Sequence, residues 1–454
     1  MRRLRLTAIL GAAGSLILAS CGNLTSSSDD AAISPEERAD SGEEGEGVIE
    51  VSVDTIAEDF VRLALAVGEY DKDYVDAYHG PTEWRDDVRA NLPTLEDLNA
   101  KATALLSSIE PKAQDDPRAR MLSRQLTAAL TRIRMAQGET FSFDEETSRL
   151  YDVVAPAYDI KEFDAILEKI DAIVPGDGPL HERVDGFRKS LAIPVDKLEA
   201  VFAEAMAECR RRTIARYTLP EGERFTTELV SDKPWSGYNW YQGDYESKIE
   251  VNTDFPVIID RAVDLGCHEG YPGHHTWNIF MEQDFLRDKG WIEYSVFALF
   301  SPPALIGEGT ANYGIEMAFP GDEKTIFERD VLYPMAGLDP EKAEQLAALN
   351  KARRRLSHSR NHIARAYLDG EIDDAEAVRL LTKYGLSSPE RAAQSLEFIK
   401  KYRGYVVNYN IGQDLVAAYI DRAEAAGEDR WDVFKDLLIK PVSASDLFAQ
   451  DRDR

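Results

Sequence analysis

One eight-residue run constrains this chain more than any other part of its sequence. It reads His268-Glu269-Gly270-Tyr271-Pro272-Gly273-His274-His275 and contains three of the seven histidines in 454 residues. Neutral imidazole is a common metal ligand, and His followed by Glu is the order of ligand and general base in zinc peptidases. The usual zinc helix has its second histidine four residues after the first, whereas here the next two stand six and seven residues later. The fold must therefore bring two widely spaced ligands back together.

Apolar residues at helical spacing before the run predict that His268 and Glu269 lie on a helix. On a regular helix, a spacing of seven residues restores the face but adds about 10 Å of rise. Pro272 removes a helical hydrogen bond, so we expect a kink or bulge that returns His274 to His268. His275 would then point elsewhere, toward substrate. The converse arrangement, with His275 as the ligand, stays open.

A third metal ligand is expected some thirty residues later. Glu308 stands between two glycines in helical sequence that is too apolar for a solvated acid. In zinc peptidases with two His ligands and one Glu ligand, a second helix supplies such a glutamate. Glu316, two turns further along, is expected to orient a ligand. Three histidines, a glutamate and a Pro-Gly pair in eight residues favour a metal site over simple packing.

Three segments of the chain resemble the bacterial "domain of unknown function 885" family. They are the run from His268 to His275, the segment Glu308-Gly309-Thr310-Ala311-Asn312-Tyr313, and the segment Gly404 to Gly412 with its Tyr409. The resemblance implies a mostly helical, zincin-like (gluzincin-type) fold and metal-dependent peptidase activity. The chain departs from the family pattern at Thr310, where Trp is frequent, and around Gly404, where Pro-Gly-Gln is frequent. These departures do not change the residues expected to bind metal. We expect them to affect which substrates the protein prefers.

The implied chemistry is hydrolysis assisted by one zinc ion, which His268, His274 and Glu308 would bind. Glu269 is expected to act as the general base and to pass the proton to the leaving amine. A phenol or a cation would stabilise the oxyanion. Tyr409 is the first candidate for that role, with Arg403 and Tyr405 behind it. A core tyrosine in an aromatic-rich turn explains Tyr409 equally well.

Two other features near this chemistry admit both a functional and a structural interpretation. The predicted strand Lys248–Asn252 could pair with an extended peptide along its edge, or form an ordinary hairpin. His358 and His362 have the spacing of metal ligands on a helix, but no glutamate follows His358. The two histidines could also face the active cleft and assist transition-state binding, but we favour simple solvation over a second metal site.

The N-terminus has the pattern of a bacterial lipoprotein signal. Basic residues precede a short apolar stretch, and small residues precede Cys21. We predict a signal peptide over residues 1–20, lipidation of Cys21, and a flexible acidic tether over 21–50. The apolar stretch is shorter than the roughly 20 residues that span a bilayer. Gly22 after the cysteine favours the outer membrane, with the protein facing the periplasm or the surface.

The remainder is predicted to be mainly α, with one small β-region immediately before the histidine run. We expect an N-terminal helical lobe over 51–223 and a metal-binding catalytic lobe over 224–454. The β-region comprises a strand at 225–230 and a hairpin of 238–241 with 247–252. Further helices are expected from Asp339 to about Leu368, and over 373–385, 388–402 and 412–427. Cys209 and Cys267 could pair in an oxidising envelope, or Cys267 could be a small buried packing residue.

The net charge of −29 argues against nucleic acid as a partner and leaves the lipid anchor as the only expected membrane contact. We therefore predict an envelope-anchored, zinc-dependent hydrolase, a metallopeptidase whose partners are short peptides or small amides. Two alternatives stay open. One is a lipoprotein that binds metal or peptide without catalysis, against which the intact His268, Glu269 and Glu308 argue. The other is a hydrolase of a non-peptide amide or ester. The oligomeric state is not indicated.

Overall fold

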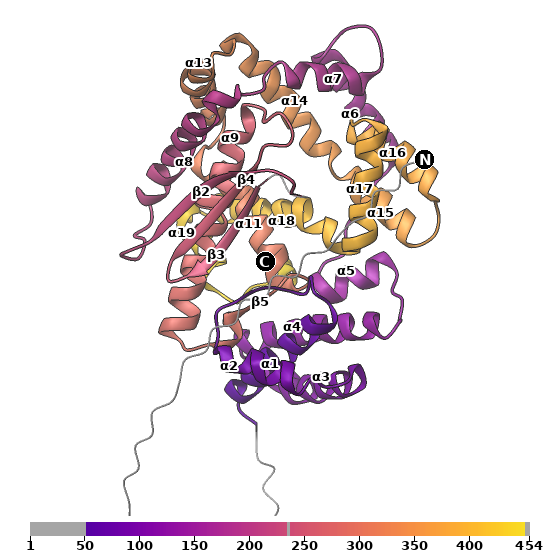
Figure 1. Cartoon of the computed structure of the whole chain (residues 1–454), viewed down its shortest axis with the longest axis vertical. Helices are drawn as coiled ribbons and strands as arrows, with labels where there is room; N and C mark the ends of the chain where they lie inside the picture. The colour runs from indigo at the N-terminus through magenta and orange to yellow at the C-terminus, as the bar shows by residue number, and fades with distance from the viewer. Residues whose placement is uncertain (1–50, 234–236, 450–454) are drawn as a thin grey trace, which may run out of the picture. The chain divides into compact units, whose positions relative to one another are not determined.

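Helices make up most of the chain, and a small sheet lies beside the predicted metal site, which confirms the predicted fold class (Figure 1). The computed structural model describes residues 51–233 and 237–449. The predicted signal peptide, Cys21 and the tether lie outside these residues. All described elements belong to one packed unit that begins at Val51, and the division into lobes at residues 223/224 remains a prediction. Within the described ranges, no helix is long and apolar enough to cross a membrane.

The first half of the unit is a group of helices around a shared apolar core. An apolar stripe from Ile56 to Val67 is buried on α1, which packs against α3 and α4. Ser52 caps α1, since its Oγ accepts a hydrogen bond from the Thr55 amide. The helices are α1 (Val53–Tyr70), α2 (Thr82–Ala90), α3 (Leu95–Ile109), α4 (Pro117–Ala136), α5 (Phe143–Tyr151), α6 (Ile160–Ile173), α7 (Leu180–Lys189) and α8 (Leu198–Ile214), with single turns η1 (Glu110–Lys112) and η2 (Val195–Lys197).

The predicted β-region forms a three-stranded sheet with the order β2-β4-β3. β4 (Glu246–Asn252) runs parallel to β2 (Arg224–Val230) and antiparallel to β3 (Gly237–Gly243). The predicted hairpin is therefore confirmed, but β4 is the central strand, and the expectation that it offers a free edge to a peptide is wrong. Glu250 and Asn252 on β4 are buried, and the side-chain amide of Asn252 donates to the Lys233 carbonyl at 2.9 Å.

The second half of the unit returns to helices. Its elements are α9 (Asp260–Leu265), η3 (Gly266–Gly270), α10 (His274–Phe280), η4 (Met281–Asp288), η5 (Ile292–Ser295), α11 (Pro302–Ala318), α12 (Glu323–Phe327), η6 (Glu328–Leu332), α13 (Tyr333–Ala336), η7 (Pro340–Lys342), α14 (Ala343–Leu356), α15 (Ser359–Leu368), α16 (Asp374–Gly385), α17 (Pro389–Tyr402), η8 (Arg403–Val406), α18 (Val407–Ala425), α19 (Arg430–Ile439) and α20 (Ala444–Ala449). A two-stranded sheet pairs β5 (Val296–Ala298) with β1 (Val75–Tyr78).

The helix predicted from Asp339 to Leu368 is broken into two. Asp339 does cap its start, since its Oδ1 accepts from the Glu341 amide. The regular α-helical hydrogen-bond pattern is interrupted at Ser357 and His358, between α14 and α15. There the Asn410 side chain donates to the Ser357 carbonyl at 3.2 Å, a long-range contact that helical spacing cannot reveal. α16 and α17 begin and end within one residue of the prediction, whereas α18 begins five residues earlier than predicted.

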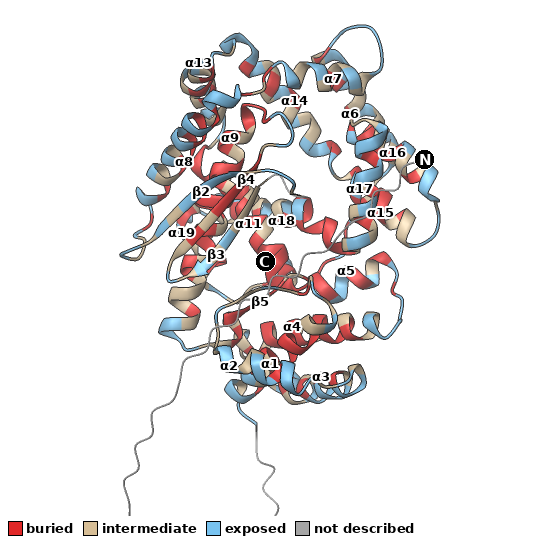
Figure 2. Ribbon diagram, viewed as in Figure 1, coloured by how far each residue is buried: buried red, intermediate tan, exposed pale blue. Residues whose placement is uncertain are grey.

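One helix of the second half, α11, is buried along almost its whole length (Figure 2). It packs chiefly against α18 and also contacts η3, α10 and α19. A helix that is apolar on all sides belongs in the core of a large unit rather than on its surface. Glu308, near the middle of α11, is therefore largely buried, with 14% of its side chain exposed.

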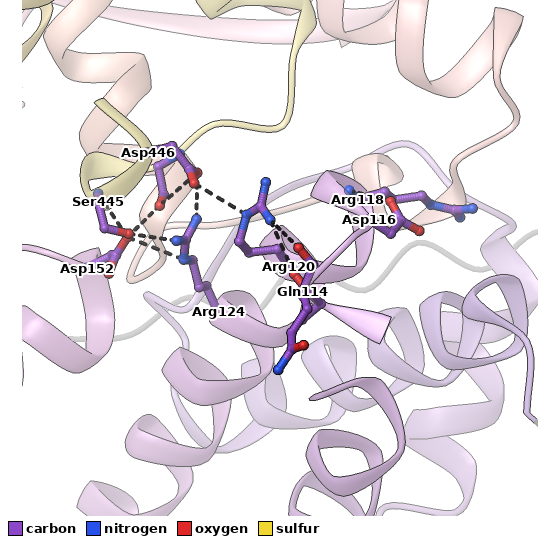
Figure 3. Close-up of polar contacts among 10 residues, drawn as sticks. Gln114, Asp116, Arg118, Arg120, Arg124, Asp152, Ser445 and Asp446 are labelled. Carbon is purple, nitrogen blue, oxygen red and sulfur yellow. Dashed lines mark hydrogen bonds and ion pairs between the residues drawn. The ribbon is translucent and has the colours of Figure 1, made fainter. Parts of the chain in front are cut away.

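Charged groups join the C-terminal helix α20 to the first half of the chain (Figure 3). Arg124 on α4 donates to Asp446 at 2.5 Å, and the Arg120 Nε lies 3.3 Å from the same carboxylate. Ser445 donates from its hydroxyl to Asp152, which follows α5. The end of the described chain is thus fixed against helices that precede it by some 300 residues.

A disulfide bond joins Cys209 on α8 to Cys267 in η3. The sequence left this pairing open, and the structure settles it. The two cysteines are separated by 58 residues, and both are fully buried. The bond ties the residue immediately before His268 to a long helix of the first half.

We expect the double variant Cys209→Ala/Cys267→Ala to lose about 4 kcal/mol of stability, because a cross-link over a loop of this length restricts the unfolded chain by about that amount. Urea unfolding of the oxidised wild type and of the variant measures the difference. Wild type treated with a reductant is the control and should approach the variant. Equal unfolding midpoints for the oxidised wild type and the variant would show that the bond adds no stability.

Candidate metal centre

A wide turn replaces the regular helix at the Pro-Gly pair. α9 continues into the π-helical turn η3, where the Tyr271 amide donates a hydrogen bond to the Gly266 carbonyl. The next backbone hydrogen bond runs from the Gly273 amide to the Cys267 carbonyl. α10 then starts at His274. A Cβ atom on Gly273 would stand 1.9 Å from the His268 carbonyl oxygen, so only glycine fits there. The kink expected at Pro272 is thus a turn that returns the chain onto His268.

This turn brings His268 and His274 together, and α11 adds Glu308. The two imidazole rings lie edge to face with centroids 4.7 Å apart. The Glu308 carboxylate places one oxygen 3.7 Å from His268 Nε2 and the other 3.8 Å from His274 Nε2. Glu269 Oε1 lies 4.0 Å from His268 Nε2. The structure therefore brings the predicted ligands together around one position, with the predicted base beside them.

The four side chains fit a divalent cation. Tetrahedral zinc with bonds of 2.0–2.2 Å separates its donor atoms by about 3.3 Å, close to the spacings of Glu308 from the two imidazoles. His268, Glu269 and His274 also offer atoms that all lie within 4.8 Å of one another. Glu308 Oε2 is buried and has no hydrogen-bond partner among the described residues. A buried carboxylate oxygen without a partner is costly, and a bound cation would remove that cost.

Burial sets the protonation of the cluster in the direction that metal binding needs. It lowers the pKa of His274 to about 4, and burial together with the neighbouring ring lowers the pKa of His268 well below its usual value. Both imidazoles are therefore neutral at pH 7 and have a lone pair to donate. Burial raises the pKa of Glu308 to about 7, and burial with the charge of Glu308 raises that of Glu269 to about 8. Two such carboxylates side by side favour a cation between them.

A contact between two glycines positions Glu308. A Cβ on Gly309 would stand 2.5 Å from the Gly412 carbonyl oxygen, and one on Gly412 would stand 2.5 Å from the Leu305 carbonyl oxygen. α11 and α18 thus approach each other backbone to backbone. Tyr405, just before α18, reaches the cluster and donates from its hydroxyl to Glu308 at 3.4 Å.

Two asparagines that the sequence did not single out support the cluster. Asn312 on α11 donates to the Glu308 carbonyl at 2.9 Å, and its side chain also hydrogen-bonds His268. Asn239 on β3 donates to the Glu269 carbonyl at 2.6 Å. Partners of this kind orient metal ligands. The position of Asn312, four residues after Glu308 on the same helix face, was a usable signal, whereas the approach of β3 to Glu269 had none in the sequence.

His275 does not reach the cluster, which corrects the expectation that it faces substrate. Its side chain is fully buried on the other side of α10. Its Nδ1 lies 2.7 Å from the Ser247 hydroxyl, and its Nε2 lies 3.2 Å from a Glu223 carboxylate oxygen. Tyr271 and Arg210 also donate to Glu223. His274 and His275 thus point to opposite sides, because neighbouring residues on a helix diverge by about 100°.

The three candidates for the oxyanion role separate in the structure. Tyr409 is 37% exposed, and burial of its hydroxyl with the nearby charge of Glu308 raises its pKa, so it stays a protonated donor. Tyr405 is buried and occupied by its bond to Glu308. Arg403 is wrong for this role, because its guanidinium pairs with the buried Glu146 at 2.6 Å. Of the three, Tyr409 is both close to the cluster and open to a ligand.

Three further residues from the sequence lie outside the cluster. Glu316 accepts from the Gly321 amide at 3.1 Å, so it caps the segment after α11 and orients no ligand, contrary to expectation. His358 contacts the Tyr158 hydroxyl at 2.9 Å and Asp414 at 3.1 Å. The His362 ring packs on Phe163. The expectation that these two histidines are simply solvated is therefore wrong, because both rings contact aromatic side chains.

Comparison with known proteins reveals a likeness in fold. No family model and no curated protein matches the chain, so the resemblance to the "domain of unknown function 885" family remains a prediction. A Colwellia psychrerythraea protein described as a "putative lipoprotein" shares the fold at a TM-score of 0.51 and 14% identity, over 88% of this chain and 76% of its own.

Two further solved structures are also similar. A Shewanella oneidensis protein described as a "putative lipoprotein of unknown function" has a TM-score of 0.45 and 12% sequence identity, over 90% of this chain and 80% of its own. The M32 carboxypeptidase of Deinococcus radiodurans has a TM-score of 0.34 and 13% sequence identity, over 85% of this chain and 88% of its own.

We expect the purified protein to bind one zinc ion, and we expect His274→Ala and Glu308→Gln to lose zinc affinity by more than the roughly 10- to 100-fold that loss of a supporting residue costs. Metal analysis after dialysis and competition with a chromogenic chelator provide the measurement. His358→Ala is the control, because it removes a half-buried histidine outside the cluster. Full zinc affinity in Glu308→Gln, or an equal loss in the control, would remove Glu308 from the ligand set.

The Glu223 network generates a prediction about acid stability. Burial alone would raise the pKa of Glu223, but the hydrogen bonds that it accepts lower it from about 4.5 to about 2. The ionised group therefore contributes stability above pH 4.5, and this contribution, about 3 kcal/mol, is lost as the pH falls toward 2. Glu223→Gln should unfold in urea with a weaker acid dependence than wild type. The exposed Glu221→Gln is the control, and an unchanged acid dependence in Glu223→Gln would contradict the prediction.

Proposed function

We propose that this protein is a lipid-anchored, metal-dependent hydrolase of the cell envelope and that it cleaves short peptides. The observation that carries the proposal is the convergence of two neutral histidines and Glu308 on one position, with Glu269 beside it. The Cys21 signal and the likeness in fold to the Colwellia psychrerythraea protein described as a "putative lipoprotein" support the anchor. The Gly22 residue supports an outer-membrane location.

His268, His274 and Glu308 would hold the zinc ion, which when bound would polarise a water molecule and the substrate carbonyl. Glu269 would accept the proton of that water and deliver it to the leaving amine. Its burial and its raised pKa of about 8 suit a group that must both take up and release a proton near neutral pH. The Asn239 amide holds the Glu269 backbone in place while this happens.

The edge of β3 offers a place for the substrate backbone. Among the described strands, β3 pairs only with β4, so its other side is open to strand addition. Gly237 on β3 lies so close to the base that a Cβ there would stand 3.3 Å from Glu269 Oε1. A peptide added along β3 would pass beside Glu269, and the hydroxyl of Tyr409 would be free to donate to the oxyanion.

We expect Glu269→Gln to lower peptide hydrolysis by about 10²- to 10⁴-fold, because the amide keeps the shape of the side chain but cannot accept the proton. Zinc content should stay at the wild-type value. Digestion of a peptide library followed by kinetics on the best substrate measures the loss. Glu316→Gln is the matched control, because it makes the same change in a carboxylate outside the cluster.

The outcomes also separate the alternatives. Zinc binding with no cleavage of any peptide, amide or ester would favour a binding lipoprotein. Cleavage of esters or non-peptide amides alone would retain the hydrolase and reject the peptidase. Full peptidase activity in Glu269→Gln would reject Glu269 as the base.

A further inference from the structure

An arginine-rich cavity lies next to the metal centre. Its volume is about 550 Å³, and residues of α9, α14, α15 and α18 form much of its wall. The chain has a net charge of −29, yet the lining contains six arginines and only two aspartates. The arginines are Arg188, Arg261, Arg353, Arg354, Arg360 and Arg391. So large a local excess of positive charge in an acidic protein calls for a physical reason.

Three of these arginines lack a partner. Arg353 and Arg354 on α14 and Arg360 on α15 make no hydrogen bond or ion pair from their guanidinium groups within residues 51–233 and 237–449. Burial and the charge of Arg188 lower the pKa of Arg353 to about 10, which still leaves it charged at neutral pH. Guanidinium groups bind carboxylates and phosphates through paired hydrogen bonds. The three side chains are therefore available to an anion.

The two aspartates of the lining form no hydrogen bond or ion pair with these three arginines, although the charge of Asp260 acts on Arg353. Asp260 accepts from the Asn350 amide at 2.7 Å, and its carboxylate lies 3.8 Å from Arg188. Asp264 lies 3.0 Å from the Lys324 ammonium. Both carboxylates are thus engaged with groups other than the three unpaired arginines.

The cavity adjoins the metal centre along two elements. Arg261 on α9 lines the cavity, and its charge also acts on His268 and Glu269. Tyr409 on α18 lines it too, and lies close enough to Glu308 for that charge to raise its pKa. A ligand in the cavity would therefore reach the cluster past the same Tyr409 that is the candidate oxyanion donor.

We propose that this cavity binds an anionic segment of the substrate, and that the substrates are peptides with two or more carboxylates on one side of the cleaved bond. This inference rests on the proposed function and adds the substrate class. The cavity is within the size range of sites for ligands much larger than a single carboxylate. Its unpaired arginines are spread over two helices, so they can bind several charges at once. Phosphate offers the same chemistry, and the experiment below distinguishes it from peptide.

The test is calorimetric titration of the zinc-loaded chain, in the Glu269→Gln background to prevent turnover, with tetraglutamate, tetra-alanine and inorganic phosphate. We expect tetraglutamate to bind and tetra-alanine not to bind. The double variant R353Q/R360Q should bind tetraglutamate at least about tenfold more weakly, and added salt should weaken binding to the parent. R355Q is the matched control, because Arg355 is an exposed neighbour on the same helix and does not line the cavity.

Several outcomes would overturn the inference. These are unchanged tetraglutamate affinity in R353Q/R360Q, equal loss in R355Q, binding of tetra-alanine as tight as that of tetraglutamate, and tighter binding of phosphate than of tetraglutamate. Thermal unfolding of each variant checks that it is folded. Milder variants, R353K and R360K, should retain part of the affinity because they keep the charge.

Turnover with Glu269 intact separates this inference from the proposed function. We expect R353Q/R360Q to lose at least about tenfold in kcat/KM on acidic peptides relative to neutral ones, with its zinc content unchanged. Absence of hydrolysis by the wild type, with zinc bound, would reject the proposed function. Hydrolysis that prefers acidic peptides equally with and without the two arginines would reject only the cavity assignment.

Discussion

The metal centre depends on the contact between Gly273 and the main chain one turn earlier. The Gly273 amide donates to the Cys267 carbonyl, and its α-carbon lies against the His268 carbonyl with no room for a side chain. If this turn opened, His274 would move away from His268 and the two imidazoles could not share an ion. The turn is held from behind as well, because Cys267 is cross-linked to α8 and a Cβ on Gly266 would stand 3.4 Å from the α8 backbone.

A second close backbone contact, between Gly309 and Gly412, positions the rest of the site. It fixes the depth at which α11 presents Glu308, and it places the start of α18 beside the cluster. Tyr409 lies at that start and lines both the approach to the metal centre and the arginine-rich cavity. Two close approaches of backbone, one at each side of the ion position, therefore determine which side chains can take part in chemistry.

The clustering of the candidate metal ligands could be predicted because their signal is local, whereas the positions of the misplaced residues could not, because their partners are distant in the sequence. His268, His274 and Glu308 stand out by residue type and spacing in apolar sequence. The position of His275 depends on Glu223 and Ser247, which come from a loop and a strand that no spacing rule connects to α10. The helix break at Ser357 depends on Asn410, and the burial of β4 depends on strand order. The arginine-rich cavity draws on seven α-helices, so no single sequence window shows it.

The net charge of the protein does not oppose the binding of an acidic peptide, because the charges act over different distances. At physiological ionic strength, exposed charges more than about 8–10 Å apart are largely screened. The surface carboxylates that produce the net charge of −29 are spread over the whole surface, whereas Arg353 and Arg360 would touch the ligand. The two buried carboxylates of the metal centre are nearer, but a divalent cation bound between them would offset their charge. Metal binding and the capture of an anionic substrate should therefore reinforce each other, because loading the ion removes the negative charge closest to the arginine-lined cavity.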